Sequence, residues 1–194
     1  MIVVLSGPSA SGKDAIAGRI LGDHPDRVAP ALTATTRPPR PGEDDGAQYH
    51  FLTPEAFDGM ESTGQLLESA TVYGFRYGVP RASVRAALDR APVALLKTDV
   101  QGARSIRALI PQALLIFLTV PALAALEGRM RSRGGLDEAA ITRRLREAQG
   151  EMERRAEFDY AVMNADGTLD AAVDSVWSII QREAARPERR PVGL

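Results

Sequence analysis

Gly7-Pro8-Ser9-Ala10-Ser11-Gly12-Lys13-Asp14 is the stretch that decides the fold of this 194-residue chain. It follows the apolar run Ile2–Leu5 and opens a helical pattern over Asp14–Leu21. Glycines in such a loop let backbone N–H groups converge on phosphate oxygens, and the N-terminus of the following helix adds partial positive charge. Lys13 is expected to reach the β- and γ-phosphates as a flexible point charge. The stretch therefore predicts a phosphate-binding loop (P-loop) between a buried strand and a helix.

The P-loop ends on an unusual residue, Asp14. The usual last residue is Ser or Thr, whose hydroxyl binds Mg²⁺. A carboxylate is also a good ligand for a hard cation and is tolerated at a helix N-terminus, although it repels phosphates unless a cation lies between them. Two interpretations stay open: Asp14 is a Mg²⁺ ligand, or it only caps the first turn of the helix.

Buried strands alternate with helices along the rest of the chain. Four runs are apolar without polar alternation, which is typical of parallel strands covered on both faces: Ile2–Leu5, Val93–Leu96, Leu114–Val120 and the shorter Tyr160–Met163. A helical pattern follows each of them: Asp14–Leu21, Gln101–Ile110, Ala122–Arg131, and the stripe of Val173, Val176, Trp177 and Ile180. This alternation predicts an α/β fold, with a parallel sheet flanked by helices.

Two segments break the alternation. Residues 32–82 are rich in Thr, Pro, Gly and Tyr with short β-like pieces, and residues 123–157 are dense in arginine and mostly helical. We interpret them as two appendages on a core made of residues 1–31, 83–122 and 158–185, with a flexible tail at 186–194. Ligands of such folds bind at the carboxyl ends of the strands, where both appendages could reach.

Composition excludes several classes of protein. The 24 basic and 25 acidic residues give a net charge of −1, which argues against a nucleic-acid or membrane binder that works through bulk charge. The absence of cysteine excludes disulfides and thiolate metal sites. The longest apolar stretch, Ala113–Val120, is too short to span a bilayer, and the N-terminus lacks the basic lead of a signal peptide, so we expect a cytoplasmic protein. Its state as a monomer or homo-oligomer stays open.

Further motifs follow the P-loop in order along the chain. They are Thr35–Glu43 (TTRPPRPGE), Gly46–Phe51 (GAQYHF), Glu68 with Tyr77-Gly78, Asp99–Gly102 (DVQG), Arg129–Gly134 (RMRSRG), Arg143-Arg144-Leu145 and Asn164. Together these motifs resemble the guanylate kinase family over residues 1–182. The resemblance implies a P-loop kinase core with a mixed α/β GMP-binding insertion (32–82) and a helical LID (123–157). It also implies transfer of the γ-phosphoryl group of ATP to GMP, and to dGMP, with Mg²⁺ as cofactor.

Four residues are suited to bind the phosphate of the acceptor. Arg37 and Arg40 lie three apart in a proline-stiffened loop, so both guanidinium groups can bind one phosphate. Tyr49 and Tyr77 can each donate a hydroxyl to it. The resemblance assigns these four residues to the GMP phosphate.

A carboxylate in an apolar stretch is the candidate that reads the base. Glu68 has apolar neighbours, where a carboxylate is costly unless it is paired. The N1–H and N2–H₂ groups of guanine are two adjacent donors that match one carboxylate; a surface glutamate on a strand is the alternative. The resemblance adds Thr33 and Asp99 to the GMP site.

The resemblance also assigns roles on the ATP side. Arg129 and Arg133 lie four apart on one helix, Arg144 lies on the next, and closure of the LID is expected to bring positive charge to the transferring group. Asn164 matches the family position beside the adenine, and residues 7–14 bind the ATP phosphates. The residues expected to act in catalysis are Lys13, Arg40, Arg129, Arg133 and Arg144.

Three positions depart from the family pattern. Asp14 replaces the hydroxyl residue, Lys97 replaces the first acid of an Asp-x-Asp motif, and Val79 stands where a hydroxyl residue often helps to read guanine. Lys97 and Asp99 face the same side of a strand end near the P-loop. We therefore hypothesise that Asp14 serves Mg²⁺ and that Lys97 balances Asp14 or contacts phosphate.

Two other functions compete with this interpretation. Gly12-Lys13-Asp14 and Tyr77-Gly78-Val79 also resemble the ribose 1,5-bisphosphate phosphokinases, but Thr35–Glu43 and Glu68 favour GMP. A non-catalytic guanylate-kinase-like interaction module is the other alternative. Such modules tend to lose the P-loop lysine and the LID arginines, which this chain keeps.

Overall fold

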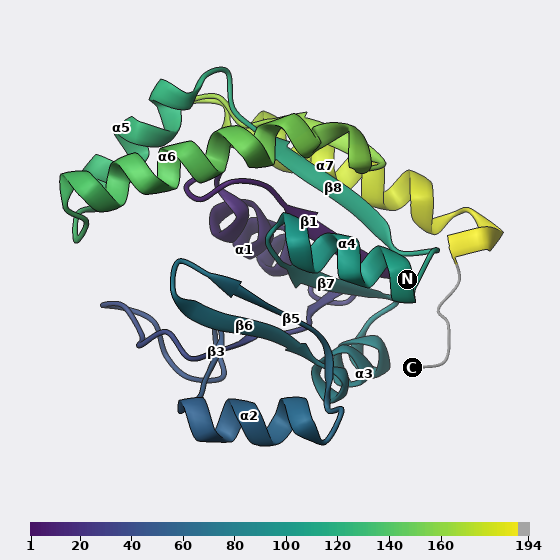
Figure 1. The fold of residues 1–194 in the computed structure, drawn as a ribbon. Coiled ribbons are helices and arrows are strands. Elements are labelled where there is room, and N and C mark those ends of the chain that lie inside the picture. Colours follow the sequence, from purple (N-terminus) through teal and green to yellow (C-terminus); the bar gives the residue numbers. More distant parts are fainter. Residues whose placement is uncertain (190–194) are drawn as a thin grey trace.

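A five-stranded parallel sheet forms the centre of the molecule. The computed structural model describes residues 1–189 (Figure 1). The strand order is β2–β7–β1–β8–β9, with all neighbours parallel. The strands are β1 (Ile2–Ser6), β2 (Val28–Pro30), β7 (Val93–Lys97), β8 (Leu114–Thr119) and β9 (Tyr160–Met163). The predicted parallel α/β sheet is therefore confirmed, with the addition of β2, whose three residues include a proline and carry no strand pattern.

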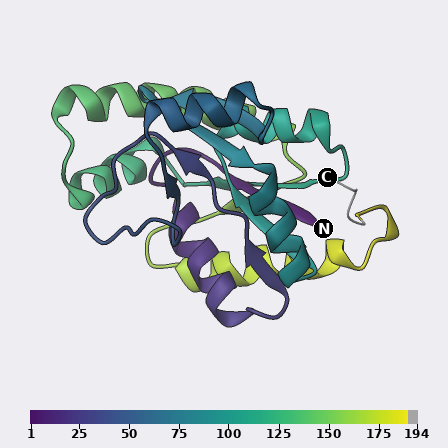
Figure 2. The same cartoon turned by 90° about the horizontal axis from the view of Figure 1, so that it is seen from below.

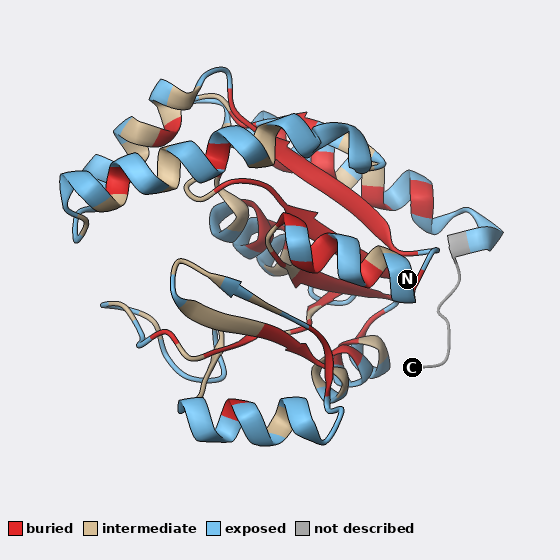
Figure 3. Ribbon diagram, viewed as in Figure 1, coloured by how far each residue is buried: buried red, intermediate tan, exposed pale blue. Residues whose placement is uncertain are grey.

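Helices cover both faces of this sheet, which explains why β1 is apolar at every position. Val3 and Leu5 pack against α1 (Lys13–Asp23) and α7 (Leu169–Ala184), whereas Ile2 and Val4 pack against α3 (Arg81–Arg90) and α4 (Val100–Leu109). Figure 3 shows the result, with buried central strands and helices whose outer faces are exposed. Burial on both faces is the property that the apolar runs of the sequence indicated.

A second, mixed sheet is built from residues within 32–82. Its order is β4–β3–β6–β5, with β3 parallel to β4 and antiparallel to β6, and β5 antiparallel to β6. The elements are β3 (Ala34–Thr35), β4 (His50–Phe51), α2 (Pro54–Ser62), β5 (Leu66–Val72) and β6 (Phe75–Pro80). Phe57 of α2 is fully buried against Ala34 and Leu66. Seen from below, α2 and this sheet lie in front of the parallel sheet (Figure 2).

A helical pair, α5 (Leu123–Arg133) and α6 (Glu138–Glu153), lies on the opposite side of the core from the second sheet (Figure 1). Leu126 and Met130 of α5 pack against Ile141 and Ala148 of α6, and a short 3₁₀ helix (Arg154–Glu157) follows. The pair and the second sheet thus flank the end of the core at which the P-loop lies.

The predicted tail begins at residue 186. Pro187–Arg189 form a short 3₁₀ helix, and the rest of the tail lies outside the described residues. Within residues 1–189, every helix is too short or too polar to cross a membrane.

Candidate functional site

The P-loop lies where β1 ends and α1 begins, at the carboxyl edge of the parallel sheet. Gly7 has φ of +134°, and a Cβ there would lie 2.4 Å from the carbonyl oxygen of Leu118, so no other residue fits. Lys13 Nζ donates hydrogen bonds back to the carbonyl oxygens of Gly7 and Pro8. Burial lowers the pKa of Lys13, and the carboxylates of Glu151, Asp14 and Asp99 oppose this shift. The predicted P-loop geometry is therefore present.

A cavity that is partly open to solvent begins at the P-loop and extends to the second sheet. Fifteen of the residues singled out in the sequence line it: Gly7, Ser9, Ala10, Lys13, Asp14, Thr33, Arg37, Arg40, Tyr49, Glu68, Tyr77, Lys97, Asp99, Arg133 and Arg144. The core, the second sheet and the α5–α6 pair all contribute to its wall. Its mixed polarity, with a few charged side chains converging on it, is that of a small-molecule site.

A group of cations faces the middle of this cavity. Arg37 Nη2 donates to Glu43 Oε1 at 3.1 Å and forms an ion pair with Glu43 Oε2 at 2.8 Å. The backbone N–H of Arg40 donates to Glu43 Oε2 at 2.8 Å. Burial lowers the pKa of Arg40, and the positive charges of Arg133 and Arg37 lower it further. Cations that repel one another across a cavity form a site for an anion such as phosphate.

A buried carboxylate marks the far end of the cavity. Glu68 on β5 is 8% exposed, and its Oε2 atom has no hydrogen-bond partner among the described residues. Burial, and then the charge of Asp99, raise the pKa of Glu68 to about 8. Gly102 allows this approach, because a Cβ there would lie 2.9 Å from the Glu68 carboxylate. An acceptor that is desolvated and unpaired is suited to a ligand that carries N–H donors.

Asp99 and Thr33 fix the frame around this carboxylate. Asp99 Oδ1 accepts from the backbone N–H of Gly102 at 2.8 Å and so caps α4. Thr33 Oγ1 donates to the carbonyl oxygen of Lys97 at 3.1 Å, which ties the second sheet to the end of β7. Val79 is fully buried in the apolar cluster beneath and does not line the cavity.

The two unusual residues of the sequence are in contact. Lys97 Nζ donates to Asp14 Oδ1 at 2.7 Å, and it also lies 5.1 Å from the centre of the Tyr49 ring. Burial alone would raise the pKa of Asp14, but Lys97, and then Lys13 and Arg133, outweigh it and hold this pKa below its usual value. Asp14 is therefore an ionised carboxylate beside the P-loop.

Five of the expected ATP-side residues do not line the cavity: Pro8, Ser11, Gly12, Arg129 and Asn164. Asn164 Nδ2 donates to the carbonyl oxygen of Ser11 at 2.8 Å, and Arg129 donates to the carbonyl oxygens of Ala10 (3.2 Å) and Asn164 (2.7 Å). Arg129 also pairs with Asp166. Both side chains therefore bind backbone carbonyl oxygens of the P-loop and support it, a role that the motif pattern did not predict.

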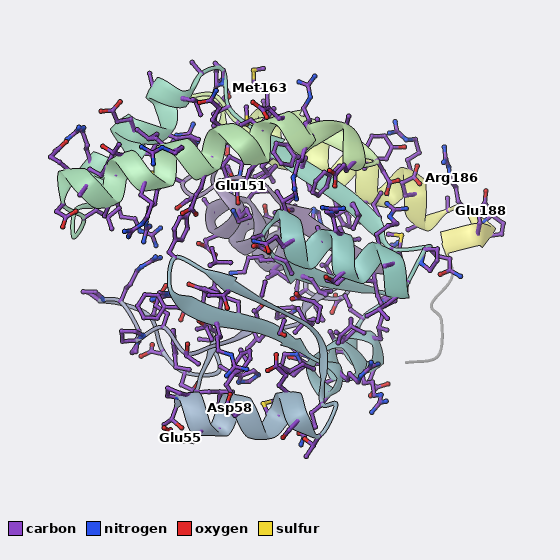
Figure 4. All side chains as sticks on the ribbon, viewed as in Figure 1. Glu55, Asp58, Glu151, Met163, Arg186 and Glu188 are labelled. Carbon is purple, nitrogen blue, oxygen red and sulfur yellow. The ribbon has the colours of Figure 1, made fainter. Side chains whose placement is uncertain are left out.

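Sequence reasoning missed three residues that shape the cavity. Glu43 was seen only as the end of a motif, yet it holds Arg37 and Arg40. Glu151 on α6 is a half-buried acid near Lys13, on the side of α6 that faces the core (Figure 4). Tyr73 stands at the tip of the β5–β6 hairpin and lines the cavity. Of these three residues, only Tyr73 could have been found from the sequence. Tyr-Gly between two β-type runs is typical of a two-residue hairpin turn, in which Asn or Asp is preferred at the position that Tyr73 occupies.

The chain is similar to known proteins over nearly its whole length. Residues 1–183 match the family model for guanylate kinase. A guanylate kinase of Leifsonia xyli subsp. xyli is 45% identical over 184 residues, which cover 94% of this chain and 72% of that protein. A guanylate kinase of Desulfitobacterium hafniense is 38% identical over 191 residues, covering 98% and 94%. The crystal structure of guanylate kinase from Anaplasma phagocytophilum has a TM-score of 0.77 at 27% identity, covering 98% of this chain and 89% of that one.

Proposed function

The chain belongs to the guanylate kinase family, and we propose that it uses this cavity to transfer the γ-phosphoryl group of ATP to GMP, and to dGMP. The observation that carries the proposal is the order of groups along one cavity. The P-loop lies at one end, cations lie in the middle, and a buried, unpaired carboxylate lies at the other end. A donor phosphate, an acceptor phosphate and a guanine require this order.

The second sheet is proposed to bind GMP. Glu68 accepts hydrogen bonds from N1–H and N2–H₂ of guanine, and these bonds favour its ionised form over the neutral form that burial favours. Arg37 and Arg40, held by Glu43, bind the GMP phosphate. Tyr49 and Tyr77, whose rings lie 6.2 Å apart, add hydroxyl donors. Residues 32–82 thus act as the GMP-binding insertion on the core at 1–31, 83–122 and 158–185.

The P-loop and the α5–α6 pair are proposed to act on the transferred group. An oxygen of the GMP phosphate attacks the γ-phosphorus of ATP, the bond between that phosphorus and the β,γ-bridging oxygen breaks, and ADP leaves. Lys13 loses its carbonyl partners and turns to the phosphates, while Arg133 and Arg144 supply positive charge from the LID (123–157). Arg129 and Asn164 support the P-loop beside the adenine site.

The described residues offer Mg²⁺ one ionised carboxylate at the P-loop rather than a cluster of protein ligands. The described residues contain no cluster of three or more His, Cys, Asp or Glu side chains that could hold a metal ion. Mg²⁺ commonly needs only one or two carboxylates plus the phosphates of a nucleotide, and Asp14 is an ionised carboxylate at the P-loop. Asp14 is therefore the residue that would hold Mg²⁺, with Lys97 fixing its orientation. When bound, Mg²⁺ supplies charge neutralisation at the phosphates.

An acceptor panel tests the proposed function. ADP release from ATP is followed with GMP, dGMP, AMP and ribose 1,5-bisphosphate as acceptors. We expect kcat/KM to be highest for GMP, with dGMP next and AMP lower by a factor of about 100 or more, because adenine has neither the N1–H nor the 2-amino group and therefore leaves Glu68 unpaired. A response to ribose 1,5-bisphosphate that exceeds the response to GMP would refute the proposal.

A further inference from the structure

The tip of the β5–β6 hairpin carries a residue in an unfavourable backbone conformation. Val72 pairs with Phe75, so Tyr73 and Gly74 form a two-residue turn, and both have positive φ (53° and 81°). Such type I′ turns favour Asn-Gly or Asp-Gly, and a bulky residue in the left-handed region is an outlier. A strained residue that the sequence retains at a site indicates a role for its side chain.

The side chain of Tyr73 contacts a part of the chain that is far from it in sequence. The guanidinium carbon of Arg144, on α6, lies 4.4 Å from the centre of the Tyr73 ring. Ser9 of the P-loop lines the same cavity as Tyr73. Tyr73 is half-buried and lines the cavity together with Ser9 and Arg144. One side chain of the hairpin therefore contacts the α5–α6 pair at the cavity that the P-loop also lines.

The contact with the ring leaves the charge of Arg144 available to phosphate. Within residues 1–189, no carboxylate pairs with Arg144, and its Nε atom is buried without a hydrogen-bond partner. The face of an aromatic ring attracts a guanidinium but does not neutralise it. A carboxylate at the same place would compete with phosphate for Arg144. An aromatic ring orients Arg144 without that competition.

We propose that Tyr73 is a positioning residue for phosphoryl transfer, which holds Arg144 of the LID over the cavity beside the P-loop. The hairpin that carries Tyr73 also carries Glu68. GMP bound at Glu68 and Arg144 held at the Tyr73 ring therefore contact the same hairpin, which couples the acceptor site to the donor side. This inference rests on the proposed function and extends it to the coupling between the two substrate sites.

Replacement of Tyr73 by asparagine separates positioning from folding. Tyr73→Asn creates the preferred Asn-Gly turn, so the hairpin keeps its register while it loses the ring and the hydroxyl. Tyr73→Phe keeps the ring and removes only the hydroxyl. Arg144→Met removes the charge that Tyr73 is proposed to hold, and Arg143→Met, on an exposed neighbouring position of α6, is its matched control.

The expected result has three parts. Tyr73→Asn lowers kcat about tenfold or more, Tyr73→Phe retains kcat within about threefold, and the melting temperature of the Tyr73→Asn protein is not below that of the wild type. The dissociation constant of GMP, measured by calorimetry without ATP, stays within about threefold in the Tyr73→Asn protein. In the Arg144→Met background, Tyr73→Asn has little further effect on kcat, whereas in the Arg143→Met background it keeps its full effect.

Two results would overturn the inference: kcat unchanged in the Tyr73→Asn protein, or an equal loss in the presence and absence of Arg144. A parallel loss of GMP affinity would overturn it as well, because Tyr73 would then belong to the GMP site. These failures differ from a failure of the proposed function, in which the wild-type protein does not phosphorylate GMP.

Discussion

Glu68→Gln is predicted to stabilise the protein without ligand and to destroy its recognition of GMP. Burial and Asp99 raise the pKa of Glu68 from 4.5 to about 8. The folded protein then binds a proton that the unfolded chain has lost, so folding stability is lost as the pH rises from 4.5 through 8. At pH 7 this loss amounts to about 3 kcal/mol, and at pH 5 to less than about 1 kcal/mol. Glutamine does not titrate and carries no such loss.

The assay is thermal unfolding at pH 5 and pH 8 in the absence of nucleotides. At pH 8 the loss is about 4 kcal/mol. For a chain of this length, each kcal/mol corresponds to about 2–4 °C, so the variant is expected to melt about 8–16 °C above the wild type at pH 8 and close to it at pH 5. Glu55→Gln, at the exposed start of α2 (Figure 4), is the matched control and is expected to show no such gap. A gap that is the same at both pH values would refute the account of Glu68.

GMP is expected to reverse the order of stability. Saturating GMP raises the melting temperature of the wild type but not that of Glu68→Gln, because the glutamine NH₂ group cannot accept from guanine. Loss of hydrogen bonds to a charged acceptor costs about 1.5–3 kcal/mol each, which raises the KM for GMP on the order of 100-fold. Stabilisation of both proteins by GMP to the same degree would contradict this role.

Four other substitutions, two of them also combined in a double variant, test the neighbouring groups. Asp14→Ser and Lys97→Asp are each expected to lower kcat about tenfold, measured over a range of Mg²⁺ concentrations. The kcat of the double variant is expected to be at least tenfold higher than two independent losses would give. A kcat equal to that of two independent losses would show that the pair is not coupled. Glu43→Gln frees Arg37, so the KM for GMP rises about tenfold while kcat changes less, and an unchanged KM would speak against this clamp. Burial raises the pKa of Glu151 to about 7, so the wild-type protein loses folding stability as the pH rises from 4.5 through 7. The Glu151→Gln protein is therefore expected to melt above the wild type at pH 8 but not at pH 4.5. An equal difference at both pH values would exclude titration of Glu151.

Local patterns made the core of the fold predictable. The P-loop and the buried runs of β1, β7, β8 and β9 are set by neighbouring residues, so their chemistry can be read along the chain. Strand β2 escaped notice because three residues with a proline carry no periodicity, and its place depends on pairing with β7. The contact of Lys97 with Asp14 was foreseeable because β1 and β7 are parallel neighbours whose carboxyl ends meet.

The remainder of the site depends on contacts between distant segments. Nothing in the sequence near Asn164 indicates that its amide would hold the Ser11 carbonyl, since 153 residues separate them. The buried state of Glu68 follows from the approach of α4 at Gly102, which no pattern in β5 contains. For Tyr73, the conflict with the preferred turn sequence is visible in the neighbouring residues, but its contact with Arg144 is not.

Product stoichiometry tests the central claim most directly. The wild-type protein is incubated with ATP, GMP and Mg²⁺, and all nucleotides are separated and quantified over time. The account predicts that one GDP forms for each ADP, that GMP and ATP are consumed equally, and that omission of GMP stops ADP formation. ADP formation without GDP, or no consumption of GMP by a folded protein, would contradict it.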